Sequence, residues 1–95
     1  MAPVRRVVLD VLKPHQPSTV EVASRLADLD GIEAVNALLV ETDAEVQTLK
    51  LTVEGSDIAV ERVDDEVERL GGSVHSVDQV VCGEYLVEEV RTPQD

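Results

Sequence analysis

Aromatic residues are almost absent from this sequence: its 95 residues include no Phe, no Trp and one Tyr. Each large aromatic side chain in a core buries about 150–250 Å², so this core must be built from aliphatic residues. Nineteen valines supply most of the aliphatic surface. A small aliphatic core in a short chain is only marginally stable, and association through an apolar face would enlarge the buried area. The composition therefore favours self-association.

Cysteine and long apolar runs are also scarce. Cys82 is the only cysteine, so an internal disulfide is impossible and a thiolate metal site lacks ligands. We expect Cys82 to be a buried or partly buried small side chain. No apolar run approaches the roughly 18 residues of a membrane span, and Met1–Arg6 lacks the apolar segment of a signal peptide. We therefore expect a cytoplasmic protein that does not enter membranes.

Basic residues are few: eight Lys and Arg stand against 20 Asp and Glu, a net charge of −12. Binding of nucleic acid requires a basic patch, and RNA-binding modules also need stacking aromatics. The composition therefore excludes nucleic acid and anionic membranes as expected partners. Few lysines with many carboxylates, Val and Ala are typical of a halophilic archaeon, in which hydrated carboxylates keep a protein soluble at high salt. On this interpretation most acidic residues carry no individual function.

The hydrophobic pattern predicts four strands and two helices. Ser18 and Glu21 fit a capping box that opens the first helix, and Gly31 suits the left-handed position after it. Gly55–Asp57 is expected to cap the second helix, which Gly71 ends. Tyr85–Val90 could add a short edge strand. The strands expected from alternation are Val4–Leu12, Val35–Thr42, Val46–Glu54 and Ser73–Val81.

The order β-α-β-β-α-β predicts a ferredoxin-like α+β fold. In this arrangement a four-stranded antiparallel sheet has the order 4-1-3-2, and both helices lie on one face. We expect a single domain over residues 1–95, with a core at about residues 4–90 and a frayed tail at residues 91–95.

Several runs resemble a known family. Leu9–His15 (Leu-Asp-Val-Leu-Lys-Pro-His) and His75–Asp78 (His-Ser-Val-Asp) are the most specific, because neither strand nor turn propensity dictates them. Together with Glu41–Asp43 they resemble the small archaeal proteins of domain-of-unknown-function family 211, over residues 4 to 90. The resemblance implies a ferredoxin-like fold, ring-like or other homo-oligomers and calcium binding. It implies no established reaction.

The topology gathers candidate ligands where strands one and two end and strands three and four begin. Asp10 stands out because it interrupts an apolar, central strand and faces the side without helices. It is either a cation ligand or interface group, or a solvated side chain bonded to His75 or Arg6. Calcium takes several oxygen ligands, and a site completed by a second subunit is the favoured form. The candidate metal ligands are Asp10, Glu41, Asp43 and Asp78.

Lys13, His15 and His75 are the other candidates. Lys13 and His15 precede a helix start, whose free N–H groups could hold an anion, and the alternative for His15 is to stabilise the turn. His75 is either a structural residue or a metal ligand. Glu54 is expected to form an ion pair with Arg5 or Arg6. We expect no enzyme, because no nucleophile–base pair, P-loop or GxGxxG motif is present.

The face of the sheet without helices is expected to carry four aliphatic residues, Val8, Leu38, Val40 and Val77. Such a face is a liability for a monomer and favours contact between subunits. The sequence therefore predicts a non-enzymatic homo-oligomer that binds a divalent cation, calcium, near a subunit interface. The alternative is a small-molecule-sensing regulatory module of ACT-like topology.

Overall fold

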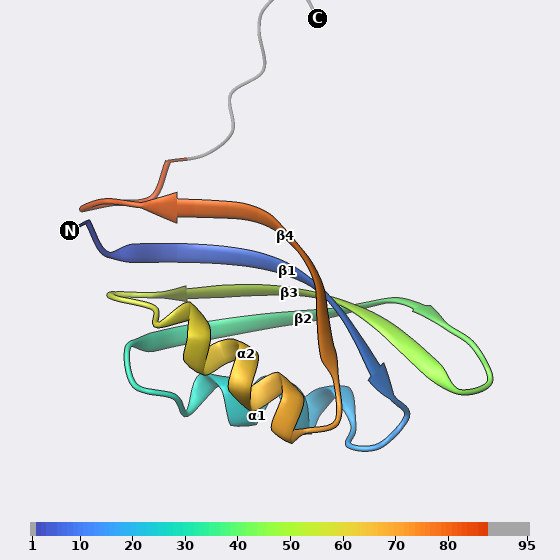
Figure 1. Cartoon of the computed structure of the whole chain (residues 1–95). Coiled ribbons are helices and arrows are strands. Elements are labelled where there is room, and N and C mark those ends of the chain that lie inside the picture. Colours follow the sequence, from blue (N-terminus) through green and yellow to red (C-terminus); the bar gives the residue numbers. More distant parts are fainter. Residues whose placement is uncertain (1, 88–95) are drawn as a thin grey trace, which may run out of the picture.

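A four-stranded antiparallel sheet with two helices on one face forms the fold in the computed structural model, which describes residues 2–87 (Figure 1). The strand order is β2-β3-β1-β4, which is the order 4-1-3-2 read from the other edge. The predicted ferredoxin-like fold is therefore confirmed. The elements are β1 (Val4–Pro14), α1 (Thr19–Ala27), β2 (Ile32–Thr42), β3 (Val46–Gly55), α2 (Val60–Arg69) and β4 (Ser73–Cys82).

The first helix begins and ends as the sequence predicts. Ser18 is the N-cap, and its Oγ accepts a hydrogen bond from the backbone N–H of Glu21 at 3.1 Å, which satisfies one of the free donors of the first turn. Gly31 has φ +84°, a conformation that only glycine adopts readily. A Cβ there would also collide with the backbone carbonyl oxygen of Asp57. The turn into β2 therefore requires glycine.

The second helix starts later than expected. Its N-cap is Ala59, which provides no side-chain cap, and the helix begins at Val60. Gly55 instead belongs to β3, and Asp57 lies beside the Gly31 turn. The capping prediction for Gly55–Asp57 was wrong because the backbone of this segment packs against the Gly31 turn between α1 and β2 before the helix begins. Close packing of the Gly31 and Gly55 backbones explains this delay.

The core lies between the sheet and the two helices and is entirely aliphatic. Leu9 of β1, Leu49 and Leu51 of β3 and Leu26 of α1 are each 0% exposed. Burying a Val or Leu side chain fully stabilises the fold by about 1.5–3 kcal/mol. The remaining members are Val7, Val11, Val22, Val53, Ile58, Val63 and Val67.

The end of the described chain differs from the sequence-based expectation. Tyr85–Val87 form no strand, and residues 88–90 of the expected edge strand lie outside the described residues. Cys82 is exposed and not buried as predicted, because it is the last residue of an edge strand. Among residues 2–87, no helix is long and apolar enough to cross a membrane.

Candidate functional site

The face of the sheet opposite the helices carries four rows of neighbouring side chains, which we call the open face. The strand register defines these rows, since residues paired across a sheet point to the same side. From β2 to β4 the rows are Ala34–Glu54–Arg6–Val81, Asn36–Thr52–Val8–Gln79, Leu38–Lys50–Asp10–Ser76 and Glu41–Thr48–Leu12–Ser73.

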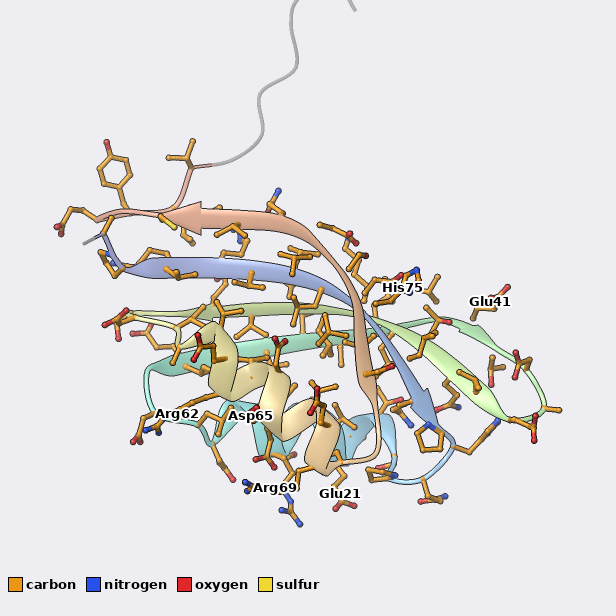
Figure 2. The ribbon with its side chains drawn as sticks, viewed as in Figure 1. Glu21, Glu41, Arg62, Asp65, Arg69 and His75 are labelled. Atoms are coloured by element: carbon orange, nitrogen blue, oxygen red, sulfur yellow. The ribbon has the colours of Figure 1, made fainter. Side chains whose placement is uncertain are left out.

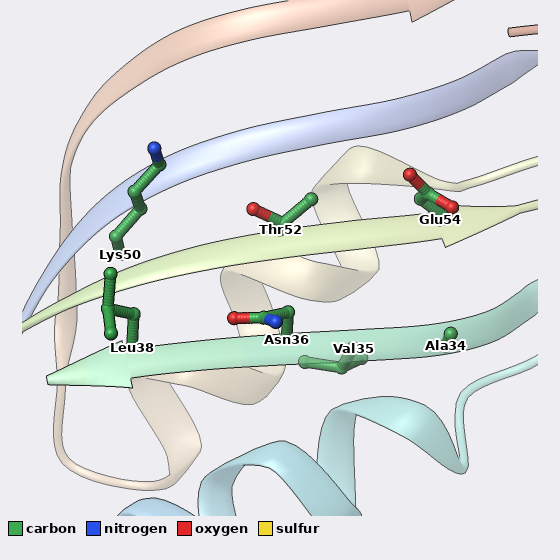
Figure 3. Close-up of a pocket in the computed structure, with 7 residues that line it drawn as sticks. All are labelled: Ala34, Val35, Asn36, Leu38, Lys50, Thr52 and Glu54. Atoms are coloured by element: carbon green, nitrogen blue, oxygen red, sulfur yellow. The ribbon is translucent and has the colours of Figure 1, made fainter.

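A hollow of about 490 Å³ lies on the open face over β2 and β3 (Figure 3). On β3 it lies where the short side chain of Thr52 stands between the long side chains of Lys50 and Glu54. Figure 3 shows Lys50, Thr52 and Glu54 rising from β3 around it, with Asn36 and Leu38 on β2. A second hollow of about 480 Å³ adjoins it over β1 and β4. The centre of the open face is therefore polar and concave.

Four charged residues dominate the open face. Arg6 Nε donates to Glu54 Oε2 at 2.7 Å, which confirms the predicted ion pair. Arg6 Nη1 also reaches Gln79 Oε1 at 3.5 Å. Lys50 and Asp10 are paired in the strand register, yet within residues 2–87 the structure shows no side-chain hydrogen bond or ion pair for either. Their charges therefore remain available to a partner.

Two of the four predicted cation ligands, Asp10 and Asp78, reach the open face near β4. Asp10 pairs with Ser76 in the register, and Ser76 Oγ donates to Asp78 Oδ1 at 2.8 Å. A register shift in β4 between its pairs with Val8 and Leu9 brings Asp78 to this side, where it lines the second hollow. The two carboxylates are therefore on the same part of the surface.

The other two predicted ligands lie at the opposite edge of the sheet. Glu41 is in β2 and pairs with Thr48, and Asp43 is in the turn between β2 and β3. The strands β3 and β1 separate them from β4. In the described part of the chain, no three His, Cys, Asp or Glu side chains lie close enough together to hold a metal ion. One chain alone therefore does not bring the four carboxylates together.

Asp43 shapes the hairpin turn. Its Oδ1 accepts hydrogen bonds from the backbone N–H groups of Val46 at 2.8 Å and Glu45 at 3.0 Å. These two bonds, that from Val46 first, lower the pKa of Asp43, because they favour the ionised carboxylate. His15 Nε2 lies 2.7 Å from the backbone oxygen of Asp43. His15 thus ties the loop before α1 to the hairpin, which supports the turn-stabilising alternative.

Lys13 has a structural role that the sequence analysis missed. It is 3% exposed, and its Nζ donates to the carbonyl oxygens of Pro17 at 2.6 Å, Pro14 at 2.9 Å and His15 at 3.4 Å. Burial lowers the pKa of this ammonium group. All three of its N–H donors face backbone carbonyls, so none is directed to an anion. Lys13 follows Val7, Leu9 and Val11 on alternating positions, and this period of two was the signal that it points to the core side.

His75 is exposed on β4 and does not pair with Asp10. The register places Ser76 opposite Asp10, and a register shift leaves His75 out of the pairing with β1. Figure 2 shows His75 on β4 and Glu41 on β2, the two outer strands. Ser76, and not His75, is therefore the β4 residue that lies opposite Asp10.

Both outer strands carry exposed aliphatic residues. We call Leu38, Leu39 and Val40 the β2 patch; they are 55%, 45% and 60% exposed. Val77 and Val80, each 51% exposed, form the β4 patch. Of the aliphatics expected on the open face, Val8 is buried there and Leu38 is exposed there.

Val77 lies on the helix side, and its predicted position was therefore wrong. It pairs with the fully buried Leu9, because a register shift in β4 changes the alternation. Val80 likewise pairs with buried Val7. In Figure 1 the end of β4 extends away from both helices, and Val77 and Val80 are each half exposed. At β4, the face of the sheet on the helix side therefore extends beyond the area that the helices cover.

Comparison with known proteins gives a consistent relationship. Residues 5–95 match the model of domain-of-unknown-function family 211, described as uncharacterised ArCR. A relative in Methanocaldococcus jannaschii, described as an uncharacterised protein, is 45% identical over 92 residues, which cover 97% of this chain and 95% of the relative. The match spans the four strands, both helices and all the candidate residues discussed above. This chain therefore belongs to domain-of-unknown-function family 211.

Proposed function

We propose that this protein is a non-enzymatic, self-assembling protein whose copies join edge to edge, with β4 of one copy against β2 of the next. The observation that carries the proposal is that aliphatic rows, buried in the middle of the sheet, end at both edges in residues that are partly or largely exposed. The three helix-side rows are Val35–Val53–Val7–Val80, Ala37–Leu51–Leu9–Val77 and Leu39–Leu49–Val11–Val74.

The strand directions fit this contact. β2 runs parallel to β1, and β4 runs antiparallel to β1, since every neighbouring pair is antiparallel. Placing β2 of a second copy beside β4 therefore makes one more antiparallel pair and continues the sheet. Exposed edge strands offer unpaired backbone N–H and C=O groups that favour such pairing.

Side-chain burial supports the same contact. The β4 patch would meet the β2 patch and Val35 of the next copy, and each aliphatic row would continue across the boundary. Burying the exposed half of an aliphatic side chain contributes about 1 kcal/mol, so the five side chains of the two patches would contribute roughly 5 kcal/mol. A head-to-tail contact repeats until it closes into a ring or extends as a filament. We propose a closed ring.

A divalent-cation site at the boundary follows from the same arrangement. Asp78 is on β4 and Glu41 on β2, the two outer strands of the sheet. The edge-to-edge contact would put the Glu41 and Asp43 edge of one copy beside the Asp10 and Asp78 edge of its neighbour. We propose calcium, because a set of carboxylate oxygens without nitrogen or sulfur suits a hard cation.

The oligomeric state tests the assembly. Val77→Glu and Leu39→Glu each place a charge in one patch, and light scattering after size-exclusion chromatography should show at least a twofold lower mass for each variant. Val20→Glu is the matched control, because Val20 is 75% exposed on α1 and belongs to neither patch. A wild-type monomer at high salt, or variants with unchanged mass, would contradict the proposal.

Calcium binding is tested separately by equilibrium dialysis with ⁴⁵Ca²⁺. Asp78→Asn and Asp43→Asn should each weaken binding at least tenfold, and Val77→Glu should do the same because it separates the two halves of the site. Asp65→Asn on α2 is the control for the loss of one surface charge. Equal binding by wild type and Val77→Glu would show that any calcium site lies within one copy.

A further inference from the structure

On the two inner strands, β3 and β1, four charged side chains of the open face alternate in sign along and across the strands. On β3, Glu54 and Lys50 lie on either side of Thr52, and on β1, Arg6 and Asp10 lie on either side of Val8. The register sets Glu54 beside Arg6 and Lys50 beside Asp10. The two negative charges therefore occupy one pair of diagonally opposite corners of a square, and the two positive charges occupy the other pair.

Such a square of alternating charges is complementary to itself. When a copy is turned over about an axis that lies in the plane of the face, along or across the strands, each charge meets one of opposite sign. When the axis runs along the strands, for example, Lys50 of one copy meets Asp10 of the other, and Glu54 meets Arg6. A face with charges of one sign would repel its own copy. Complementary potentials of this kind select the partner and fix its orientation.

We propose that the open face is a second self-association surface, on which another copy packs face to face about a two-fold axis in the plane of the interface. This contact uses the sheet face, whereas the proposed assembly uses the strand edges; Asp10 is the residue that the face contact shares with the proposed cation site. A two-fold contact uses the same patch on both copies. The patch is also the side of the sheet that neither helix covers (Figure 1).

The size of the face suits a specific but moderate contact. Four strands about 4.8 Å apart and six-residue spans at about 3.4 Å per residue give roughly 500 Å² per copy once side chains are included. The total of roughly 1,000 Å² reaches the lower limit of specific interfaces. Packed sheets lie about 10 Å apart with their strands nearly aligned, a gap that Lys50 and Asp10 can span together. Ordered water can fill the hollows over Thr52.

Lys50 and Asp10 are the residues on which this contact depends most. Within residues 2–87 their side chains form no hydrogen bond or ion pair, although the two residues are register neighbours. Lys50 is exposed in a chain of net charge −12. A second copy would give both groups partners and shield those pairs from salt, whereas salt screens the overall repulsion between two acidic copies. We therefore expect the contact to strengthen as ionic strength rises from low values.

Charge reversal in the edge-blocked background of Val77→Glu tests the face. Sedimentation velocity across protein concentrations should show a dimer, and Lys50→Glu should raise its dissociation constant at least tenfold. Arg62→Glu is the matched control, because it makes the same change in net charge on exposed α2, and it should leave the dimer intact. Circular dichroism should show equal folding of the variants.

A variant in which all four charges of the square are inverted gives a more specific test. The fourfold variant Arg6→Glu, Asp10→Lys, Lys50→Asp and Glu54→Lys should dimerise with itself but not exchange subunits with the unmutated face, as measured by native mass spectrometry. The proposal is overturned if the Val77→Glu protein is monomeric at all concentrations, or if Lys50→Glu and Arg62→Glu behave alike. If the Val77→Glu oligomer has the same mass as the wild-type oligomer, the edge proposal fails. The comparison of Lys50→Glu with Arg62→Glu, made in the wild-type background, then still tests the face-to-face contact.

Discussion

Replacing Lys13 with methionine should destabilise the protein, because the Lys13 ammonium group donates to backbone carbonyl groups. The substitution keeps an unbranched side chain in the buried position and removes the three N–H donors that hold the carbonyl groups of Pro14, His15 and Pro17. The loop that leads into α1 then loses its anchor. A stability change is therefore expected without a change of the core.

The magnitude follows from the environment of the ammonium group. A hydrogen bond from a charged donor contributes about 1.5–3 kcal/mol, but Pro14 and His15 are exposed, so water can replace the lysine at their carbonyls. Burial also lowers the pKa of Lys13, because desolvation disfavours the charged form and offsets part of the hydrogen-bond energy. We therefore expect the loss to amount to the bond with Pro17, about 2 kcal/mol, and a fall in Tm of roughly 8–16 °C for a domain of this size.

Thermal and urea unfolding followed by circular dichroism measure this loss at pH 7. Arg62→Met is the control, because it removes a cation from an exposed position on α2 and should change the free energy of unfolding by no more than about 0.5 kcal/mol. A Lys13→Met protein as stable as the control would refute the anchoring role and return Lys13 to the list of ligand candidates.

Three further predictions concern pH, salt and packing. The folded-state pKa of Asp43 is lowered, so its contribution to stability is present above the unfolded pKa near 3.8 and is lost as pH falls through the folded value. In urea unfolding, Asp43→Asn should therefore flatten the dependence of the free energy of unfolding on pH in this range. An equal dependence in the variant and the wild type would contradict this prediction. If the acidic surface is adapted to salt, Tm should rise steadily from low to molar KCl, because screening reduces the repulsion within a chain of net charge −12; a flat or falling Tm would oppose this interpretation. Gly55→Ala should lower stability by about 1–3 kcal/mol, since its Cβ would collide with the backbone oxygen of Gly31. Ser56→Ala at the exposed neighbouring position is the control, and equal effects would contradict the packing argument.

The fold could be predicted closely because its signals are local. Period-two alternation marked the four strands, and Ser18 and Gly31 marked the ends of the first helix through capping and left-handed geometry. The ion pair between Arg6 and Glu54 followed from topology alone, since antiparallel neighbours bring the start of one strand to the end of the other.

The site was harder to predict because register shifts decide which way a side chain points. One register shift in β4 places Val77 on the helix side and Asp78 on the open face. No propensity in the sequence marks this shift. The pairing of Lys50 with Asp10 also required the register. Lys13 could have been recognised as core-facing from its alternation with Val11, but its charge favoured a surface interpretation.

Complementation between two one-sided variants tests the edge-to-edge assembly most directly. Val77→Glu blocks the β4 patch and Leu39→Glu blocks the β2 patch, and both proteins carry Lys50→Glu so that the open face does not contribute. Each variant alone should be monomeric by native mass spectrometry. An equal mixture should form a dimer with one copy of each, because one intact β4 edge then meets one intact β2 edge. A mixture that stays monomeric, or a dimer formed by either variant alone, would contradict the head-to-tail contact.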